Sequence, residues 1–323
     1  MKFSQLRRII PVIFLLLASV PAAAQIQDVY AIPAVAHAPG NAGTLWVSDF
    51  HLMNPQPHEL TVTLVFIPSG GGVGDAFDIV VDPNTTIYSD NLLADAFLLS
   101  EGRGSLLVAA LPEDNPGLQK IQRSFIVHSR AFNLTDQGTL GQGIDGAMTG
   151  LLDYDLDQIS ALATGVRNFG SPGVGGYRTN VGALNTGRAS ITLEIVVFDD
   201  EGNNIATMPL IVPPQGHVQD ALPTPVNHGT IEFFVEDPLN DVQGFVFPYA
   251  SVVDNRTGDA VYLDPKLLAL PGSLFKRALL RSPTDGMPID AIRPILAAAH
   301  HRGRGALARG ADGMKIVGPR RLE

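Results

Sequence analysis

Two stretches of the chain alternate between apolar and other residues with a period of two. In residues 60–67 and 191–198, every second residue is a large aliphatic or aromatic one. This period places one set of side chains on a core and the other toward water, which predicts β-strands. β-branched residues such as Thr61 and Thr192 fit a pleated surface and favour the same structure.

The two alternating stretches belong to a longer internal match. A shift of 131 positions brings residues 31–87 into register with residues 162–218 without a gap. The matched residues agree in class, as in the pairs Trp46/Tyr177, Asn54/Asn185, Val81/Val212 and Pro83/Pro214. After gaps, residues 104–106 match 229–231, and Ala131 matches Ala250. Because self-similarity at a fixed spacing marks repeated structural units, the pattern predicts a tandem duplication.

Further strands complete each copy. We predict them at 46–54, 77–81, 104–110 and 121–134 in the first copy, and at 177–185, 208–212, 229–235 and 244–253 in the second. Turn residues such as Asn54-Pro55 and Asp199-Asp200 separate them. In the first copy, residues 92–99 are the one helical candidate. About seven short strands over about 110 residues are typical of an immunoglobulin-like β-sandwich, so we predict an all-β chain of two such sandwiches.

The first 24 residues have the pattern of a secretory signal peptide. Lys2, Arg7 and Arg8 precede an apolar stretch at 9–20, and three alanines end at Ala24. This stretch is shorter than the roughly 20 residues that a membrane-spanning helix needs. We therefore expect cleavage before Gln25 and no transmembrane span afterwards, with an uncleaved anchor as the alternative. The mature protein is expected to be secreted, periplasmic or on the cell surface.

The predicted layout has five parts. These are a signal peptide at 1–24, a first sandwich at 25–145, a linker at 146–158, a second sandwich at 159–270 and a basic tail at 271–323 that is mostly disordered. The linker prediction rests on a glycine-rich stretch at 138–150. We expect each copy to fold alone, since each has a complete set of alternating strands.

Charge separates the tail from the rest. The chain has 22 basic and 32 acidic residues and no cysteine, which excludes disulfides and thiol chemistry. Residues 25–271 hold 9 basic and 28 acidic side chains, whereas residues 272–323 hold 10 basic and 4 acidic ones. The acidic part would repel nucleic acid. The tail reads either as a dispensable disordered segment with a short helix at 289–299, or as an electrostatic clip to an anionic envelope polymer or to the acidic part of the chain.

Candidate ligand-binding motifs are weak. Asp153, Asp155 and Asp157 have the spacing of a calcium loop, but Gln158 and Thr164 stand where that loop needs Gly and Glu. The acidic turn at 199–201 reads as a polar hairpin tip with a cation site as the alternative. The glycine runs at 70–74 and 173–176 precede extended sequence rather than the helix that a phosphate cradle requires.

Catalytic patterns are missing as well. The eight histidines do not form the spacing of a zinc protease, although His51 and His58 could approach across a turn. The chain has no Gly-x-Ser-x-Gly elbow. Trp46, the only tryptophan, matches Tyr177 at a core-facing position, so a structural role is favoured over a grip on sugar. We therefore predict no catalytic, cofactor-binding or metal-binding residue.

Several short segments support a resemblance at the level of the fold. Arg178-Thr-Asn-Val, Asn185-Thr-Gly, Val197-Phe-Asp-Asp-Glu-Gly and Tyr249-Ala-Ser-Val-Val-Asp-Asn-Arg-Thr-Gly-Asp, together with the signal peptide, resemble repeats in uncharacterised secreted proteins of environmental bacteria. More loosely, they resemble CARDB-type and other bacterial immunoglobulin-like modules. The resemblance covers about residues 31–265. It implies the fold and no particular activity.

These observations favour an exported, non-catalytic protein that serves interaction or structure at the cell envelope. The expected partner is an unknown protein or an envelope polysaccharide. One alternative is a carbohydrate-binding sandwich, which requires Trp46, Tyr88, Tyr177 and Tyr249 to be exposed on one face. The other is a secreted hydrolase, which requires acidic or histidine side chains to converge in one pocket.

Overall fold

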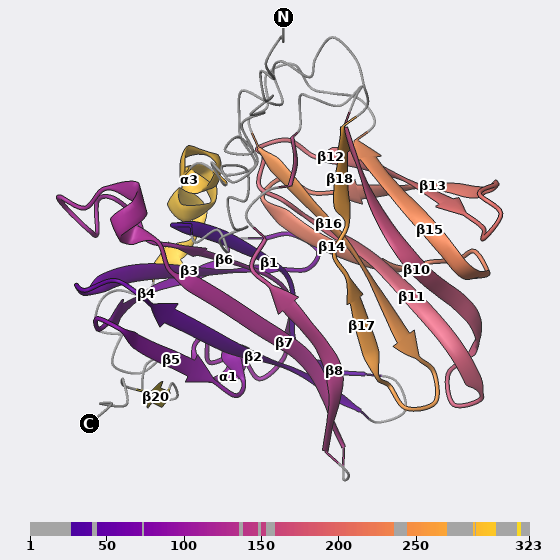
Figure 1. The fold of residues 1–323 in the computed structure, drawn as a ribbon, viewed down its shortest axis with the longest axis horizontal. Coiled ribbons are helices and arrows are strands. Elements are labelled where there is room, and N and C mark those ends of the chain that lie inside the picture. Colours follow the sequence, from indigo (N-terminus) through magenta and orange to yellow (C-terminus); the bar gives the residue numbers. More distant parts are fainter. Residues whose placement is uncertain are drawn as a thin grey trace, which may run out of the picture.

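The protein is all-β, as predicted, and the described strands form two sheets of ten strands each (Figure 1). The computed structural model describes residues 27–40, 44–72, 74–135, 138–147, 150–152, 159–235, 244–269, 287, 289–301 and 315–317. The predicted signal peptide and the aspartates at 153–157 lie outside these residues.

The first sheet takes eight strands from the first copy and two short strands from the tail. They are β1 (Val29–Pro39), β2 (Leu45–Asn54), β3 (Leu60–Pro68), β4 (Asp75–Val81), β5 (Thr85–Ser89), β6 (Gly102–Ala109), β7 (Ile126–Thr135), β8 (Gly138–Asp145), β19 (His300–His301) and β20 (Lys315–Val317). A short helix, α1 (Leu92–Asp95), and a 3₁₀ turn, η3 (Lys120–Arg123), lie between strands.

The second sheet is formed by the second copy alone. Its strands are β9 (Leu151–Leu152), β10 (Ile159–Ser171), β11 (Gly175–Asn185), β12 (Ile191–Phe198), β13 (Asn204–Val212), β14 (Gly216–Ala221), β15 (Val226–Val235), β16 (Phe245–Asp254), β17 (Ala260–Leu263) and β18 (Lys266–Ala269).

Each sheet folds over on itself around its own core. In the first, a layer of order β4-β3-β6-β1 faces a layer of β5, β2, β7 and β8, and the layers meet where the ends of β1 and β2 pair. Leu64 and Leu106 of one layer pack in the same cluster as Phe50 and Ile87 of the other. The second sheet has the corresponding layers, β13-β12-β15-β10 and β14-β11-β16-β17, around a second cluster. The packing is that of a β-sandwich.

The two sandwiches have the same strand pairing. Seven pairings of the first sheet, such as β1–β6, β2–β7 and β3–β4, recur in the second as β10–β15, β11–β16 and β12–β13. The register of β3 with β4 begins at Leu60↔Val81, and that of β12 with β13 at Ile191↔Val212, so both partners move by the 131 positions found in the sequence.

A buried asparagine fixes the same turn in both sandwiches. The side-chain amide of Asn54 lies 2.9 Å from the carbonyl oxygen of His58 and 3.0 Å from that of Val81. The Asn185 amide lies 2.8 Å from the carbonyl oxygen of Ala189 and 3.5 Å from that of Val212. Both side chains are buried, so the backbone carbonyls supply the hydrogen-bond partners that buried polar groups need.

Three details differ from the sequence predictions. The register places Ser48 opposite Ala131, and Thr179 opposite Val252, so the counterpart of Ala131 is Val252 and not Ala250. The glycine-rich stretch that suggested the linker begins as strand β8 at 138–145, inside the predicted first sandwich, and Leu151–Leu152 of the predicted linker form β9, which pairs with β16. The helix predicted at 92–99 is limited to the four residues of α1, which Asn91 caps.

The strand order differs from that of an immunoglobulin domain. In the constant-type order the first two strands share a layer. Here β1 and β2 belong to facing layers. Each of the two sandwiches therefore differs in strand order from the constant-type immunoglobulin domain.

A third core joins the two sandwiches. Val65 and Leu107, on the outer face of the β4-β3-β6-β1 layer, pack with Phe245 and Phe247 from the outer face of β16. The same cluster takes in helix α3 (Ile289–Ala298) of the tail, which Figure 1 shows beside β1, β3 and β6. The two sandwiches and the helix therefore share a buried apolar cluster in addition to the separate core of each sandwich. Independent folding of each copy stays a prediction.

The described part of the tail is structured and partly buried, which differs from the mostly disordered segment that we expected. Met287, Ile292 and Ile295 are at most 3 % exposed. The predicted helix exists and continues through Pro294, and β19 and β20 pair with β4 and β5. The apolar residues are few, but helical spacing collects them on one face, which meets an apolar surface that the strands had left open.

Truncating the tail helix should destabilise the protein. We expect Ile292→Ala to lower the free energy of unfolding by about 2–4 kcal/mol, because it leaves a cavity in the third core. The matched control is Ile211→Ala on β13, where the side chain is 67 % exposed and the change should stay within about 0.5 kcal/mol. Urea unfolding of both variants measures the difference. Equal values would mean that α3 contributes nothing to the fold.

Candidate binding cleft between the two sheets

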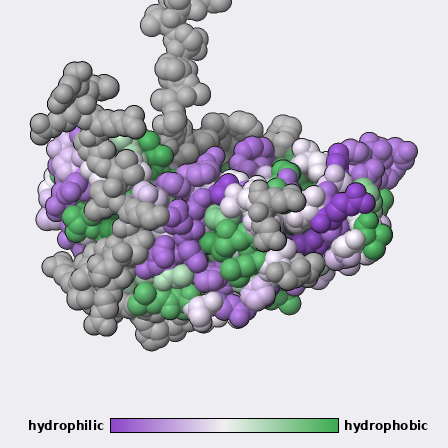
Figure 2. All heavy atoms as spheres, turned by 90° about the horizontal axis from the view of Figure 1, so that it is seen from below, coloured by the Kyte–Doolittle hydropathy of each residue, from purple (hydrophilic) through white to green (hydrophobic). Residues whose placement is uncertain are grey.

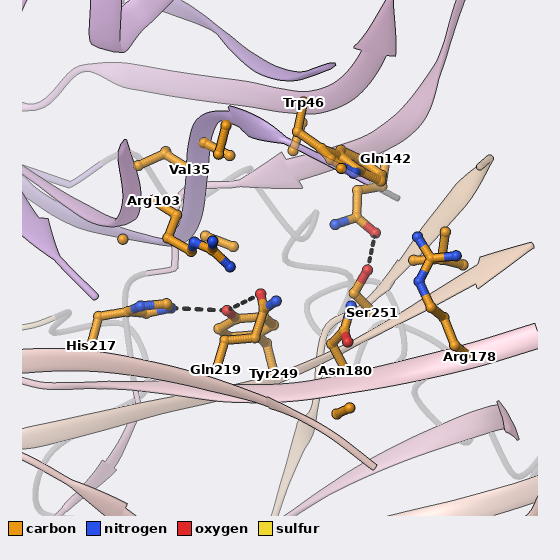
Figure 3. A pocket seen from close by; sticks show the side chains of 18 of the residues that line it. Val35, Trp46, Arg103, Gln142, Arg178, Asn180, His217, Gln219, Tyr249 and Ser251 are labelled. Atoms are coloured by element: carbon orange, nitrogen blue, oxygen red, sulfur yellow. Dashed lines mark hydrogen bonds between the residues drawn. The ribbon is translucent and has the colours of Figure 1, made fainter. Parts of the chain in front are cut away.

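Beside the third core, the two sandwiches enclose a cleft of about 410 Å³ (Figure 3). One wall comes from β1, β2, β6, β7 and β8, and the other from β11, β14 and β16. The described residues that line it are Ala34, Val35, Ala36, Ala38, Pro39, Gly40, Trp46, Arg103, Gly104, Ala131, Gln142, Arg178, Asn180, His217, Gln219, Ala221, Tyr249, Ser251 and Val253.

Strand alternation builds the polar wall. On β16, Val246 and Ala250 point into the second core, while Phe245 and Phe247 point outward into the third. The same outward face continues as Tyr249, Ser251 and Val253 in the cleft. A period of two keeps these side chains together. One face of one strand thus changes from apolar contact to polar lining.

A β-bulge builds the opposite wall. The register of β1 with β6 shifts between Ile32 and Val35. Before the shift, Ala31 lies in the third core, and after it Ala36 and Ala38 line the cleft. Because an extra residue reverses which face a side chain occupies, the bulge turns the small alanines toward the cleft and leaves room there.

A chain of four side chains crosses from one sandwich to the other at the edge of the cleft. Ser69 Oγ lies 2.6 Å from His217 Nδ1, His217 Nε2 lies 2.9 Å from the Tyr249 hydroxyl, and that hydroxyl donates to Gln219 Oε1 at 2.9 Å. Since the single phenolic proton goes to Gln219, His217 donates through Nε2. Its Nδ1 therefore accepts from Ser69. The backbone reinforces this contact, because Gly70 N donates to the His217 carbonyl oxygen at 3.0 Å.

Burial sets the protonation states of His217 and Tyr249 in this hydrogen-bond network. His217 is 2 % exposed, and burial lowers its pKa to about 3. Tyr249 is fully buried, and burial raises its pKa. Both rings are neutral across the physiological range, so the network acts as a fixed set of hydrogen bonds.

The serine–histidine pair does not have the arrangement of a hydrolase. An imidazole with a pKa near 3 is a weak base at neutral pH. Its second nitrogen donates to the phenol of Tyr249 instead of to a carboxylate, so this hydrogen-bond network contains no carboxylate that would stabilise an imidazolium ion. The pair ties two sandwiches together through a hydrogen bond that the buried setting strengthens.

Two further hydrogen bonds hold the walls of the cleft at a fixed distance. Ser251 of β16 donates to Gln142 Oε1 of β8 at 2.8 Å. The Asn133 amide of β7 donates to the Gly258 carbonyl oxygen, in the turn after β16, at 2.8 Å. Gln142, Ser251 and Asn133 are all buried.

Charge in the cleft comes from two arginines, one on each sandwich. Arg103 on β6 is exposed, and Figure 3 shows its guanidinium directed between the walls. Arg178 on β11 is half-buried, and its Nη1 donates to Asn255 Oδ1 at 3.1 Å. Burial lowers the pKa of Arg178, while the nearby charge of Asp254 raises it. Among the described lining residues there is no Asp or Glu.

The aromatic side chains considered for a sugar platform do not form one. Tyr249 is buried beneath the cleft, and Trp46 is half-buried at its side. Tyr177 packs edge-on against Phe169, and Tyr88 stacks on His51. The four rings make separate contacts and are not exposed together on one face, which the carbohydrate-binding alternative requires.

The other candidate residues also have structural partners. His58 Nε2 lies 2.9 Å from the Gln122 carbonyl oxygen, whereas His51 stacks on Tyr88. The Asp199 carboxylate accepts hydrogen bonds within its own turn, from Asn203 above all, which lowers its pKa. In the part of the chain that the structure describes, no group of three His, Asp or Glu side chains could hold a metal ion.

Comparison with known proteins adds no assignment. No protein-family model matches the chain, and no curated protein matches it. The resemblance to repeats of secreted bacterial proteins therefore stays a prediction.

Acid should weaken the protein through His217. A histidine with a lowered pKa in the folded state costs stability as pH falls below about 6.5, because the unfolded chain binds the proton first. The loss grows to about 3 kcal/mol near pH 4.5. We expect His217→Gln, which cannot titrate, to show a shallower fall in unfolding free energy between pH 6.5 and 4.5. Carboxylates that gain protons in both proteins as the pH falls cancel in this comparison. Parallel curves for the two proteins would contradict the assignment.

Proposed function

We propose that the chain is an exported, non-catalytic protein that binds its ligand in the cleft between its two sandwiches. The observation that carries the proposal is the cleft itself, whose walls come from both sandwiches and are held by the Ser69–His217 and Gln142–Ser251 contacts. Its volume is within the range of about 300–1,000 Å³ that small-molecule sites occupy. Fixed walls favour binding because little order has to be imposed when the ligand enters.

Export and location rest on the sequence. The basic residues, apolar stretch and alanines of residues 1–24 support secretion into the periplasm, the cell surface or the medium. None of the described helices is long and apolar enough to cross a membrane. The partner is an unknown protein or a component of an envelope polysaccharide.

We also propose that the two sandwiches arose by tandem duplication. The shared pairings, the common shift of 131 positions and the repeated asparagine turn support this origin. The immunoglobulin-like class stays a prediction, because the layers differ in strand order from the constant-type arrangement.

The exposed surface favours the cleft as the binding site rather than a broad apolar interface. On the face that Figure 2 shows, hydrophobic residues occur as separate patches among hydrophilic ones. The exposed large hydrophobic residues, such as Leu98, Ile126, Val174 and Ile211, come from different strands and loops.

Filling the cleft should abolish capture of the ligand. Ala36→Phe places a ring among the lining residues, whereas Thr207→Phe places the same ring on exposed strand β13 as the matched control. Immobilised mature protein is incubated with cell-envelope extract of the source organism, and retained material is identified by mass spectrometry. We expect wild type and Thr207→Phe to retain the same compound and Ala36→Phe to lose it. Retention that is equal in all three, or nothing retained by wild type, would contradict the proposal.

A further inference from the structure

The cleft departs in charge from the protein around it. Residues 25–271 carry 28 acidic and 9 basic side chains. Two of the nine, Arg103 and Arg178, line the cleft, and the described lining contains no acidic residue. Because one arginine lies on each wall of the cleft, the positive charge favours anions at this place in an otherwise acidic part of the chain.

The two guanidinium groups have donors to spare. Among the described residues, the Arg103 side chain makes no hydrogen bond or ion pair. Arg178 uses one nitrogen on Asn255 and forms no ion pair within the described chain. A guanidinium carries five N–H groups arranged to match a carboxylate. Both arginines are therefore available to a ligand.

The neutral polar side chains of the cleft also present donors. Gln142 Oε1 accepts from Ser251, and Gln219 Oε1 accepts from Tyr249. Each amide oxygen is thus used inside the protein, and each NH₂ group is left for the cleft. Asn180 lies on the same wall as Gln219, and Gln142 faces them from the other wall (Figure 3). A ligand that satisfies these side chains must be rich in acceptors.

From these observations, and on the basis of the proposed function, we infer that the ligand of the cleft is a small organic anion with carboxylate groups. Arg103 of the first sandwich and Arg178 of the second bind carboxylate groups of the ligand. The amide groups of Gln142, Asn180 and Gln219 donate to further oxygens of the ligand. The apolar wall of Ala36, Ala38 and Trp46 covers the carbon skeleton. Such an anion can be an acidic sugar or a polycarboxylic acid without sugar, since both share this chemistry.

Isothermal titration calorimetry of the mature protein distinguishes an acidic sugar from a polycarboxylic acid without sugar. The probes are digalacturonate as acidic sugar, citrate as polycarboxylate, and the neutral disaccharide of galactose as uncharged control. We expect at least one anion to bind, with affinity that falls as salt rises, and no binding of the neutral sugar. Whichever anion binds more tightly identifies the source.

Variants tie binding to the cleft. Arg103→Gln and Arg178→Gln should each weaken anion binding about tenfold or more, and Arg103→Lys should weaken it less, because it keeps the charge and loses the two-pronged geometry. Arg188→Gln removes the same charge from an exposed turn and should leave affinity unchanged. A melting curve for each variant excludes unfolding as the cause.

Three results would overturn the inference. They are binding of neither anion at millimolar concentration, equal binding of the neutral sugar, and anion binding that the two glutamine variants leave unchanged. The extract experiment stays separate, since a neutral compound captured by wild type and lost in Ala36→Phe would sustain the proposed function while refuting the anion.

Discussion

The rest of the structure depends on the apolar contact between the outer face of one sandwich and the outer face of the other. Strand β16 is central to it, because Phe245 and Phe247 meet the outer face that includes Val65 and Leu107. Outer sheet faces are ordinarily solvated in antiparallel sandwiches, so this burial removes an apolar surface that neither unit could leave in water. The contact places the two units in one fixed relation, and the tail helix completes it through Ile292 and Ile295.

The cleft exists because this contact stops partway along β16. Beyond Phe247 the outward residues become Tyr249 and Ser251, which hydrogen-bond across the gap or along its floor. The alanines that the β1 bulge presents opposite them are too small to fill the space. Apolar residues therefore set the position of the walls, and buried hydrogen bonds keep that position.

Sequence periodicity predicts the sandwiches well and the cleft poorly. Local pattern and turn chemistry decide both the strands and their register. The alternation that begins at Leu60 and Ile191 marks the strands, and Asn54 and Asn185 mark the same turn in the two copies. Arg103 and His217 carry no such signal. They become neighbours of the same cleft only through contacts between elements more than a hundred residues apart. Sequence patterns do not reveal the docking of the tail helix, because its docking surface is formed by strands that look complete without it.

The contact between the sandwiches is made by non-equivalent layers, β4-β3-β6-β1 of the first and β14-β11-β16 of the second. A head-to-tail contact of this kind can be repeated by identical units, which then form a ring or an open filament. The second sandwich has Glu232 where the first has Leu107, as the pairs Val65↔Leu107 and Val196↔Glu232 show. A carboxylate at that position forbids burial against a third unit. At this position the outer layer of the second sandwich is therefore unsuited to the apolar contact that the equivalent layer of the first sandwich makes.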